Sequence, residues 1–199
     1  GFGIAYGPED KPLPVDEMID AGAQTIKTGL DYGMDQAHPL RYLPDDVFAA
    51  ICRRARERGV PSSAHITKPD NFVKAARLGL TECAHVPTEL LSDEEIAEVA
   101  ATGMTFTATA SIFDMVSAET GEQIMDAVLS NIGRLYHAGV SLAVGTDFMF
   151  ENPPYQTVGI PMHELRLLAK AGLTVEEVIR CATIESAEHC GVADETGSL

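Results

Sequence analysis

Four side chains capable of metal or proton chemistry stand at or near the ends of short apolar segments: Lys27, His65, His85 and Asp147. Neutral imidazoles are common ligands for zinc and related divalent ions. An aspartate beside such an ion can act as a further ligand or accept a proton from an activated water. The four residues therefore predict a metal site formed by Lys27, His65, His85 and Asp147, in which Asp147 would be a metal ligand, the catalytic base, or both.

The lysine needs a separate explanation, because an ammonium group does not bind a metal cation. Lys27 follows an apolar segment, so partial desolvation is expected to favour its neutral amine. A neutral amine can react with carbon dioxide to give a carbamate, which is an anionic ligand able to bridge two metal ions. The same amine would also suit Schiff-base catalysis. The structural alternative is a lysine whose stem lies along apolar surface while its charge reaches solvent.

Alternating strands and helices are predicted to position these residues. Five short strands are expected, at residues 23–28, 60–66, 80–86, 104–108 and 140–147. Ser92 with Glu95, and Thr174 with Glu177, have the spacing of capping boxes that begin helices. Residues 114–121 are predicted to form a polar loop and residues 122–138 a long helix. Parallel α/β proteins place their chemistry at the carboxyl ends of the strands, so the four side chains would face one mouth.

Charge and hydrophobicity limit the partners of this protein. The net charge of −16 over 199 residues argues against binding to nucleic acid or to an anionic membrane surface. No apolar run reaches the roughly 20 residues of a membrane span, and no signal-peptide pattern is visible, so we expect a cytoplasmic protein. The four cysteines, Cys52, Cys83, Cys181 and Cys190, lack Cys-x-x-Cys spacing and are expected to be reduced thiols.

The remaining histidines are assigned to structure rather than to chemistry. His38 lies in the segment after Lys27 and is expected to be an exposed loop residue. His137 and His189 are expected near helix C-termini, where a partial positive charge is favourable. His163-Glu164 does not continue into the His-Glu-x-x-His motif of zinc proteases, because residue 167 is leucine.

The order lysine, histidine, histidine and aspartate at successive strand ends resembles the amidohydrolase superfamily of metal-dependent hydrolases, which have a (β/α)8 barrel. The segment Ala-Gln-Thr-Ile-Lys27-Thr-Gly resembles the strand that carries the family's carboxylated lysine. Ala-His65, Glu-Cys-Ala-His85 and Val-Gly-Thr-Asp147 are similar to its fifth, sixth and eighth strands. The similarity is greatest to the Xaa-Pro dipeptidase and imidazolonepropionase-like branch.

The resemblance implies a partial TIM (β/α)8-type barrel of about five parallel strands, equivalent to strands 4–8, with outer helices. Residues 1–199 would form this single partial-barrel domain, and the first strands and small β-sandwich of the family would be absent. The family's first metal uses a His-x-His pair, which this sequence lacks. Its second metal uses the lysine, His65 and His85. We therefore expect one or two divalent ions, with zinc as the expected metal and the first ion lacking its histidine pair.

Two functions of different kinds follow from these observations. The first is a hydrolase that cleaves an amide, peptide or cyclic amide bond of a small-molecule or dipeptide-like substrate through a metal-activated water. The second is a catalytically inactive barrel fragment that acts as an oligomeric or binding module. Because five strands leave two open sheet edges, a homo-oligomer or a strand-exchanged assembly is expected in either case.

Overall fold

A parallel five-stranded sheet organises the part of the chain that the computed structural model describes, which is residues 15–31, 43–148 and 150–198. The strands lie in sequence order, each parallel to its neighbour. They are β1 (Ile26–Gly29), β2 (Ser62–His65), β3 (Glu82–Ala84), β4 (Thr105–Thr107) and β5 (Leu142–Ala143). The predicted set of five parallel strands with outer helices is therefore confirmed.

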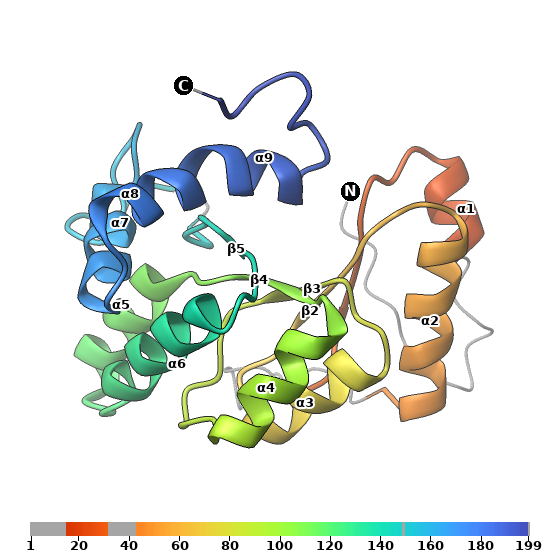
Figure 1. Cartoon of the computed structure of the whole chain (residues 1–199), viewed down its shortest axis with the longest axis horizontal. Coiled ribbons are helices and arrows are strands. Elements are labelled where there is room, and N and C mark those ends of the chain that lie inside the picture. Colours follow the sequence, from red (N-terminus) through yellow and green to blue (C-terminus); the bar gives the residue numbers. More distant parts are fainter. Residues whose placement is uncertain (1–14, 32–42, 149, 199) are drawn as a thin grey trace.

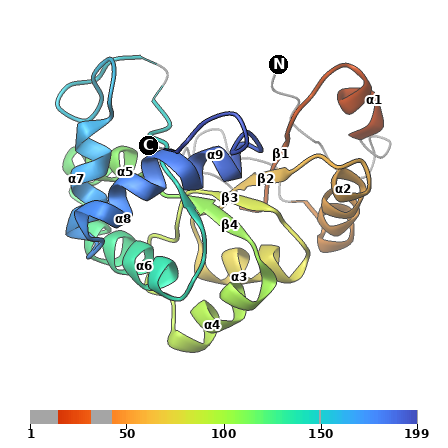
Figure 2. The same cartoon turned by 45° about the horizontal axis from the view of Figure 1, so that its top comes forward.

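Helices connect each strand to the next, as parallel pairing requires. The connecting helices are α2 (Asp45–Glu57), α3 (Pro69–Arg77), α4 (Asp93–Thr102), α5 (Ala110–Thr120) and α6 (Met125–His137). Helix α1 (Val15–Asp20) precedes β1. After β5 come α7 (Met162–Lys170), α8 (Val175–Arg180), the π-helical turn η1 (Cys181–Glu185) and α9 (Ser186–His189). Figures 1 and 2 show α2, α3, α4 and α6 in an arc around one side of the sheet, with α9 on the other side.

The two faces of the sheet differ in chemistry because side chains alternate along each strand. The parallel register aligns a row of buried, mostly apolar residues across the sheet: Thr28, Ala64, Cys83, Phe106 and Leu142. The neighbouring row on the opposite face is polar: Lys27, Ser63, Glu82 and Thr105. The polar row identifies the inner face of the curved sheet, which is where a barrel fold places its functional groups.

Helix α9 contributes to the inner face through His189. The His189 Nδ1 lies 3.1 Å from Thr105 Oγ1, and its Nε2 lies 3.9 Å from Glu82 Oε1. A cavity of about 960 Å³ lies beside these groups at the amino ends of the strands, with Ser63 also in its wall. The inner face is therefore polar and accessible here, in contrast to the face that the helices cover.

Residues 110–120 form α5, so the prediction of a polar loop at 114–121 was wrong. The segment has no strong amphipathic stripe, and its first turn is stabilised by a partner distant in sequence. The buried carboxylate of Glu164 accepts hydrogen bonds from the backbone N–H groups of Ala110 and Ser111. Gly121, in the left-handed conformation, ends the helix. The following helix accordingly begins at Met125, later than predicted.

Local signals elsewhere predicted the elements correctly. Both predicted capping boxes begin helices in the structure: Ser92 with Glu95 begins α4, and Thr174 with Glu177 begins α8. The strand predicted at 140–147 is shorter in the structure, where β5 covers Leu142–Ala143. Three of the cysteines are buried free thiols, and Cys190 is an exposed free thiol. In the described ranges, no helix is both long and apolar enough to cross a membrane.

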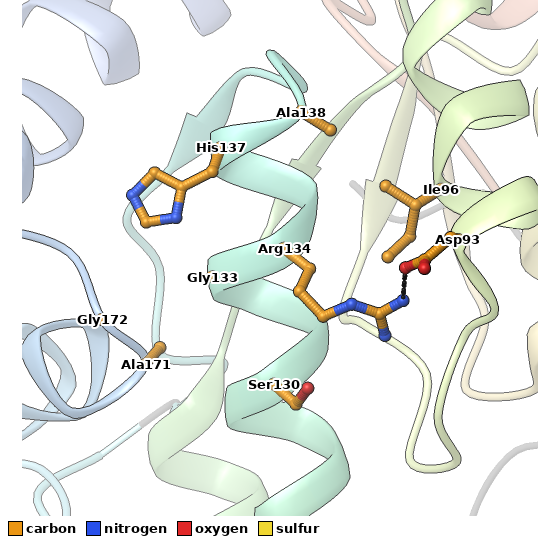
Figure 3. Close-up of a pocket in the computed structure, with 9 residues that line it drawn as sticks. All are labelled: Asp93, Ile96, Ser130, Gly133, Arg134, His137, Ala138, Ala171 and Gly172. Carbon is orange, nitrogen blue, oxygen red and sulfur yellow. Dashed lines mark hydrogen bonds and ion pairs between the residues drawn. The ribbon is translucent and has the colours of Figure 1, made fainter.

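Close packing outside the sheet depends on one glycine of α6. Figure 3 shows a pocket between α4 and α6 in which Arg134 pairs with Asp93 at 2.6 Å. Gly133 faces Ala171 in the turn after α7, and a Cβ added to Gly133 would lie 2.1 Å from the Ala171 carbonyl oxygen. The absence of a side chain at Gly133 therefore lets these two elements approach each other.

We predict that Gly133→Ala destabilises the protein, although alanine is normally the better helix former by about 1 kcal/mol. The overlap with Ala171 is expected to outweigh that gain and to lower the free energy of unfolding by about 1–3 kcal/mol. Urea denaturation measures the difference. Ser130→Ala, on the same helix, is the control and should change stability by less than about 0.5 kcal/mol. Equal or higher stability of Gly133→Ala would contradict the packing.

Candidate metal centre

His65 and His85 lie side by side at the carboxyl ends of neighbouring strands. His65 is the last residue of β2, and His85 directly follows β3. Their ring centroids are 4.6 Å apart in an edge-to-face arrangement. The parallel pairing of β2 with β3 thus brings together two residues twenty positions apart, as the sequence predicted.

Lys27 lies on the same face but within its strand. It is the second residue of β1, so its predicted place at the strand end was wrong. Its register partner is Ser63, and Lys27 Nζ donates a hydrogen bond to Ser63 Oγ at 3.4 Å. His65 lies two residues beyond Ser63 on the same face, and, in addition to burial, the positive charge of Lys27 lowers the pKa of both histidines.

Asp147 approaches the pair from the segment after β5. Its Oδ2 lies 3.8 Å from His85 Nε2, and its side chain is 59% exposed. Gly145 lets this segment pass close to β4, because a Cβ there would lie 2.6 Å from Thr107 Cγ2. The structure therefore gathers the four predicted residues at one mouth. His38, predicted to be an exposed loop residue, lies outside the described residues.

Both imidazoles are held in their neutral form. Burial, together with the charges of His65 and Lys27, lowers the pKa of His85 to about 3. Burial also lowers the pKa of His65, although the nearby carboxylate of Asp31 opposes that shift. A neutral imidazole offers a nitrogen lone pair, which is the form that binds a metal ion.

One buried nitrogen of the site has an unused bonding capacity. His65 Nε2 is buried and makes no hydrogen bond with any of the described residues. No group of three or more His, Cys, Asp and Glu side chains able to hold a metal ion is found among the described residues. Lysine is not a member of that set, so the two histidines would need Lys27, in an anionic form, as their third partner. With Lys27 in an anionic form, the unbonded nitrogen of His65 and the two neutral rings fit a divalent ion.

Asp31 belongs to the site and was missed by sequence reasoning. It lies two residues beyond β1 and is buried. Its Oδ2 accepts hydrogen bonds from Thr67 N at 2.6 Å and Thr67 Oγ1 at 3.2 Å, while Oδ1 lies 3.6 Å from His65 Nε2. The available signal was a carboxylate four residues after the site lysine.

Backbone strain is concentrated around the same mouth. Among the described residues, three other than glycine have positive φ: His85 at 85°, Thr109 at 50° and Asp147 at 60°. Thr109 contacts the site directly, since its Oγ1 lies 2.7 Å from His85 Nδ1. Strained backbone of this kind persists where surrounding contacts determine it, and it clusters at functional sites. Thr109 is a second residue that sequence reasoning missed.

Comparison with known proteins agrees with this geometry. The sequence model of the amidohydrolase family matches residues 4–199. The chain belongs to the amidohydrolase family. Members of this family generally bind divalent metal ions. None of the curated proteins compared with the chain matches it.

Solved structures share the fold of this family member. A crystal structure described as an amidohydrolase is 28% identical, with a TM-score of 0.79, and the match covers 98% of this chain and 49% of that one. A Xaa-Pro dipeptidase with bound methionine in its active site is 19% identical, with a TM-score of 0.80 over 98% and 50% of the two chains. Ochratoxinase of A. niger is 23% identical, with a TM-score of 0.78 over 97% and 46%. The chain thus spans about half the length of these structures.

We predict that the metal-free protein loses stability as the pH falls from 7 to 5. The native state keeps His85 neutral down to about pH 3, whereas the unfolded chain protonates it near pH 6.5. Unfolding therefore takes up protons in this window, which costs up to about 1.4 kcal/mol of stability per pH unit. Urea denaturation across the pH range measures the slope.

The variant His85→Gln should have a shallower dependence of stability on pH than the native protein. His137→Gln removes a half-exposed histidine and should leave the slope unchanged. Equal slopes for the native protein and His85→Gln would show that His85 is not held neutral by the fold.

Proposed function

We propose that this chain carries the metal-binding and proton-transfer groups of a hydrolase that cleaves amide bonds. The observation that carries the proposal is the adjacent pair of neutral imidazoles, with Lys27 below them on the same face and Asp147 beside His85. Membership of the amidohydrolase family supports the reaction class. The bond would be a peptide, another amide or a cyclic amide.

The proposed ligands are His65, His85 and Lys27, with zinc as the expected ion. The histidines would bind through nitrogen lone pairs, and His65 Nε2 is free for this purpose because it has no hydrogen bond. The neutral amine of Lys27 would add to carbon dioxide, forming an N–C bond and releasing one proton. The resulting carbamate oxygen is anionic, so the lysine changes from a repelling cation into a ligand.

A bound divalent ion supplies a water of lowered pKa and polarises the substrate carbonyl. Asp147 would accept the proton of the attacking water, a role supported by its solvent-accessible carboxylate and by its distance of 3.8 Å from His85 Nε2. The same carboxylic acid would then donate its proton to the leaving nitrogen. Asp31, whose carboxylate accepts a hydrogen bond from Thr67 N, lies beside His65 and would help to hold that ring in place.

The substrate class is proposed to be a small, dipeptide-like amide. One structural neighbour is described as a Xaa-Pro dipeptidase with bound methionine in the active site, which favours a dipeptide-like substrate, and another is described as ochratoxinase. Both are under 25% identical to this chain, so they support the fold directly and the substrate only by analogy.

A second candidate function rests on the edges of the sheet. Within the part of the chain that the structure describes, β1 and β5 each pair with a single strand, and the sequence contains no His-x-His pair. An open barrel of this kind would associate with a second copy or exchange strands, acting as a binding module without turnover. Metal-dependent hydrolysis by the purified chain would exclude this alternative.

We predict that the purified, metal-free chain binds about one zinc ion per chain when bicarbonate is present. His65→Ala and Lys27→Ala are each expected to weaken binding at least about tenfold, because each removes a proposed ligand. Isothermal titration and elemental analysis measure affinity and stoichiometry. His137→Ala is the control. Unchanged affinity in His65→Ala, or no binding by the native chain, would contradict the proposed site.

We also predict that Asp147→Asn lowers kcat by about 10²–10⁴-fold, the usual contribution of a general base. The amide keeps the size of the side chain but cannot accept the proton of water. Turnover of dipeptides with C-terminal proline and of N-acyl amino acids, with zinc present, provides the assay. Zinc affinity should remain near that of the native chain. Full activity in Asp147→Asn would assign the base to another residue.

A further inference from the structure

A fully buried carboxylate in α7 has no part in the chemistry above. Glu164 has no exposed surface, and burial raises its pKa. Glu164 Oε1 accepts a hydrogen bond from Ala110 N at 2.8 Å, and Oε2 accepts bonds from Ser111 N at 2.7 Å and Ser111 Oγ at 2.5 Å. Three donors offset the cost of burying this group. All three belong to the first turn of α5.

Glu164 takes the place that the side chain before a helix normally fills. The first N–H groups of a helix have no partner within the helix and are usually satisfied by a Ser, Thr, Asp or Asn at the N-cap. Thr109 occupies that position before α5, yet its side chain makes no capping hydrogen bond. Glu164 of α7 instead accepts hydrogen bonds from two of these N–H groups, those of Ala110 and Ser111. The hydroxyl of Thr109 is therefore available for another partner.

That partner is His85. Thr109 is buried, and its Oγ1 lies 2.7 Å from His85 Nδ1. Its backbone has the left-handed conformation, which is costly for a β-branched residue. The hydrogen bonds from Ala110 and Ser111 to Glu164 fix the chain immediately after Thr109. They provide the restraint that keeps the hydroxyl against the imidazole.

The consequence for His85 concerns its tautomer and its orientation. A hydroxyl can donate or accept, so the two tautomers of His85 differ in the direction of this hydrogen bond; when Thr109 Oγ1 accepts from Nδ1–H, the lone pair resides on Nε2. His85 Nε2 points to the side of the mouth where Asp147 lies, with 3.8 Å between the two atoms. Partners on the far nitrogen of a metal-binding histidine set ring orientation and tautomer in this way.

We propose that Glu164 is a positioning residue which, by anchoring the start of α5, holds Thr109 so that its hydroxyl fixes the orientation and tautomer of His85. The role of the tautomer rests on the proposed function, in which His85 binds the metal ion. The chain of contacts itself runs through protein groups alone. It is therefore testable in the metal-free protein.

The experiment records long-range ¹H–¹⁵N correlations of the histidine rings in the ¹⁵N-labelled, metal-free full chain. The His85 signals are assigned by their loss in His85→Gln. In the native chain we expect a single tautomer with the proton on Nδ1. In Glu164→Gln, the amide NH₂ opposes a backbone N–H donor, so the His85 signals should move toward an average of the two tautomers.

Matched variants separate positioning from general loss of stability. Thr109→Val removes the hydroxyl and should give the same averaged His85 signals, while Thr109→Ser keeps the hydroxyl and should restore the native pattern. Glu185→Gln alters another buried carboxyl, which accepts a hydrogen bond from Tyr136, and should leave His85 unchanged. If Glu164→Gln does not fold, the Thr109 pair and Ser111→Ala, which removes one of the three donors, test the same chain of contacts.

A native His85 pattern in folded Glu164→Gln, or in Thr109→Val, would overturn the proposal. Zinc titration of the same samples tests the metal site separately from the positioning role of Glu164. Glu164→Gln is expected to weaken zinc binding by about 10–100-fold, as loss of an outer partner commonly does. If the native chain binds no zinc but the His85 tautomer still depends on Glu164, the metal site is refuted and the positioning role stands. If the native chain binds zinc but the His85 tautomer is the same in Glu164→Gln, the positioning role is refuted and the metal site stands.

Discussion

The parallel register between β2 and β3 is the constraint on which the candidate site depends. It aligns the carboxyl ends of the two strands, so that His65 and His85 lie with their rings 4.6 Å apart. The same register divides the sheet into a covered apolar face and a polar inner face. Helices on the apolar side supply the burial energy, which leaves the inner face free to hold lysine, histidine and carboxylate side chains.

Burial then determines the chemistry of the histidines. Removing the two rings from water disfavours their charged forms, and the ammonium of Lys27 acts in the same direction. The same region holds strained backbone at His85, Thr109 and Asp147, and Glu164 of α7 holds the first turn of α5 directly after Thr109. The site therefore depends on elements far from it in sequence, including a glutamate that never reaches the mouth.

Short-range signals in the sequence predicted much of this arrangement. The apolar runs ending in His65 and His85 predicted adjacent ligands, and the capping boxes at Ser92 and Thr174 predicted two helix starts. The sequence did not predict α5, because its first turn is capped by Glu164 from more than fifty residues away. Asp31 and Thr109 were missed for the same reason: each acts through a contact that the fold creates, with Thr67 or with His85.

The resemblance to amidohydrolases is confirmed for the family and the fold, while the metal, the substrate and the assembly remain proposals. The chain spans about half the length of the solved structures that it matches, and within the described residues its sheet ends at β1 and β5. Lys27 lies on β1, His65 ends β2 and His85 directly follows β3. The three proposed ligands therefore come from neighbouring strands of one sheet.

X-ray absorption at the zinc edge of the zinc-loaded chain tests the central claim most directly, because it reports the atoms bound to the metal. We predict two imidazole nitrogens at about 2.0 Å, with the remaining ligands oxygen, and one imidazole fewer in His65→Ala. Zinc bound through sulfur, or an imidazole count that His65→Ala leaves unchanged, would contradict the site assigned to these two strand ends.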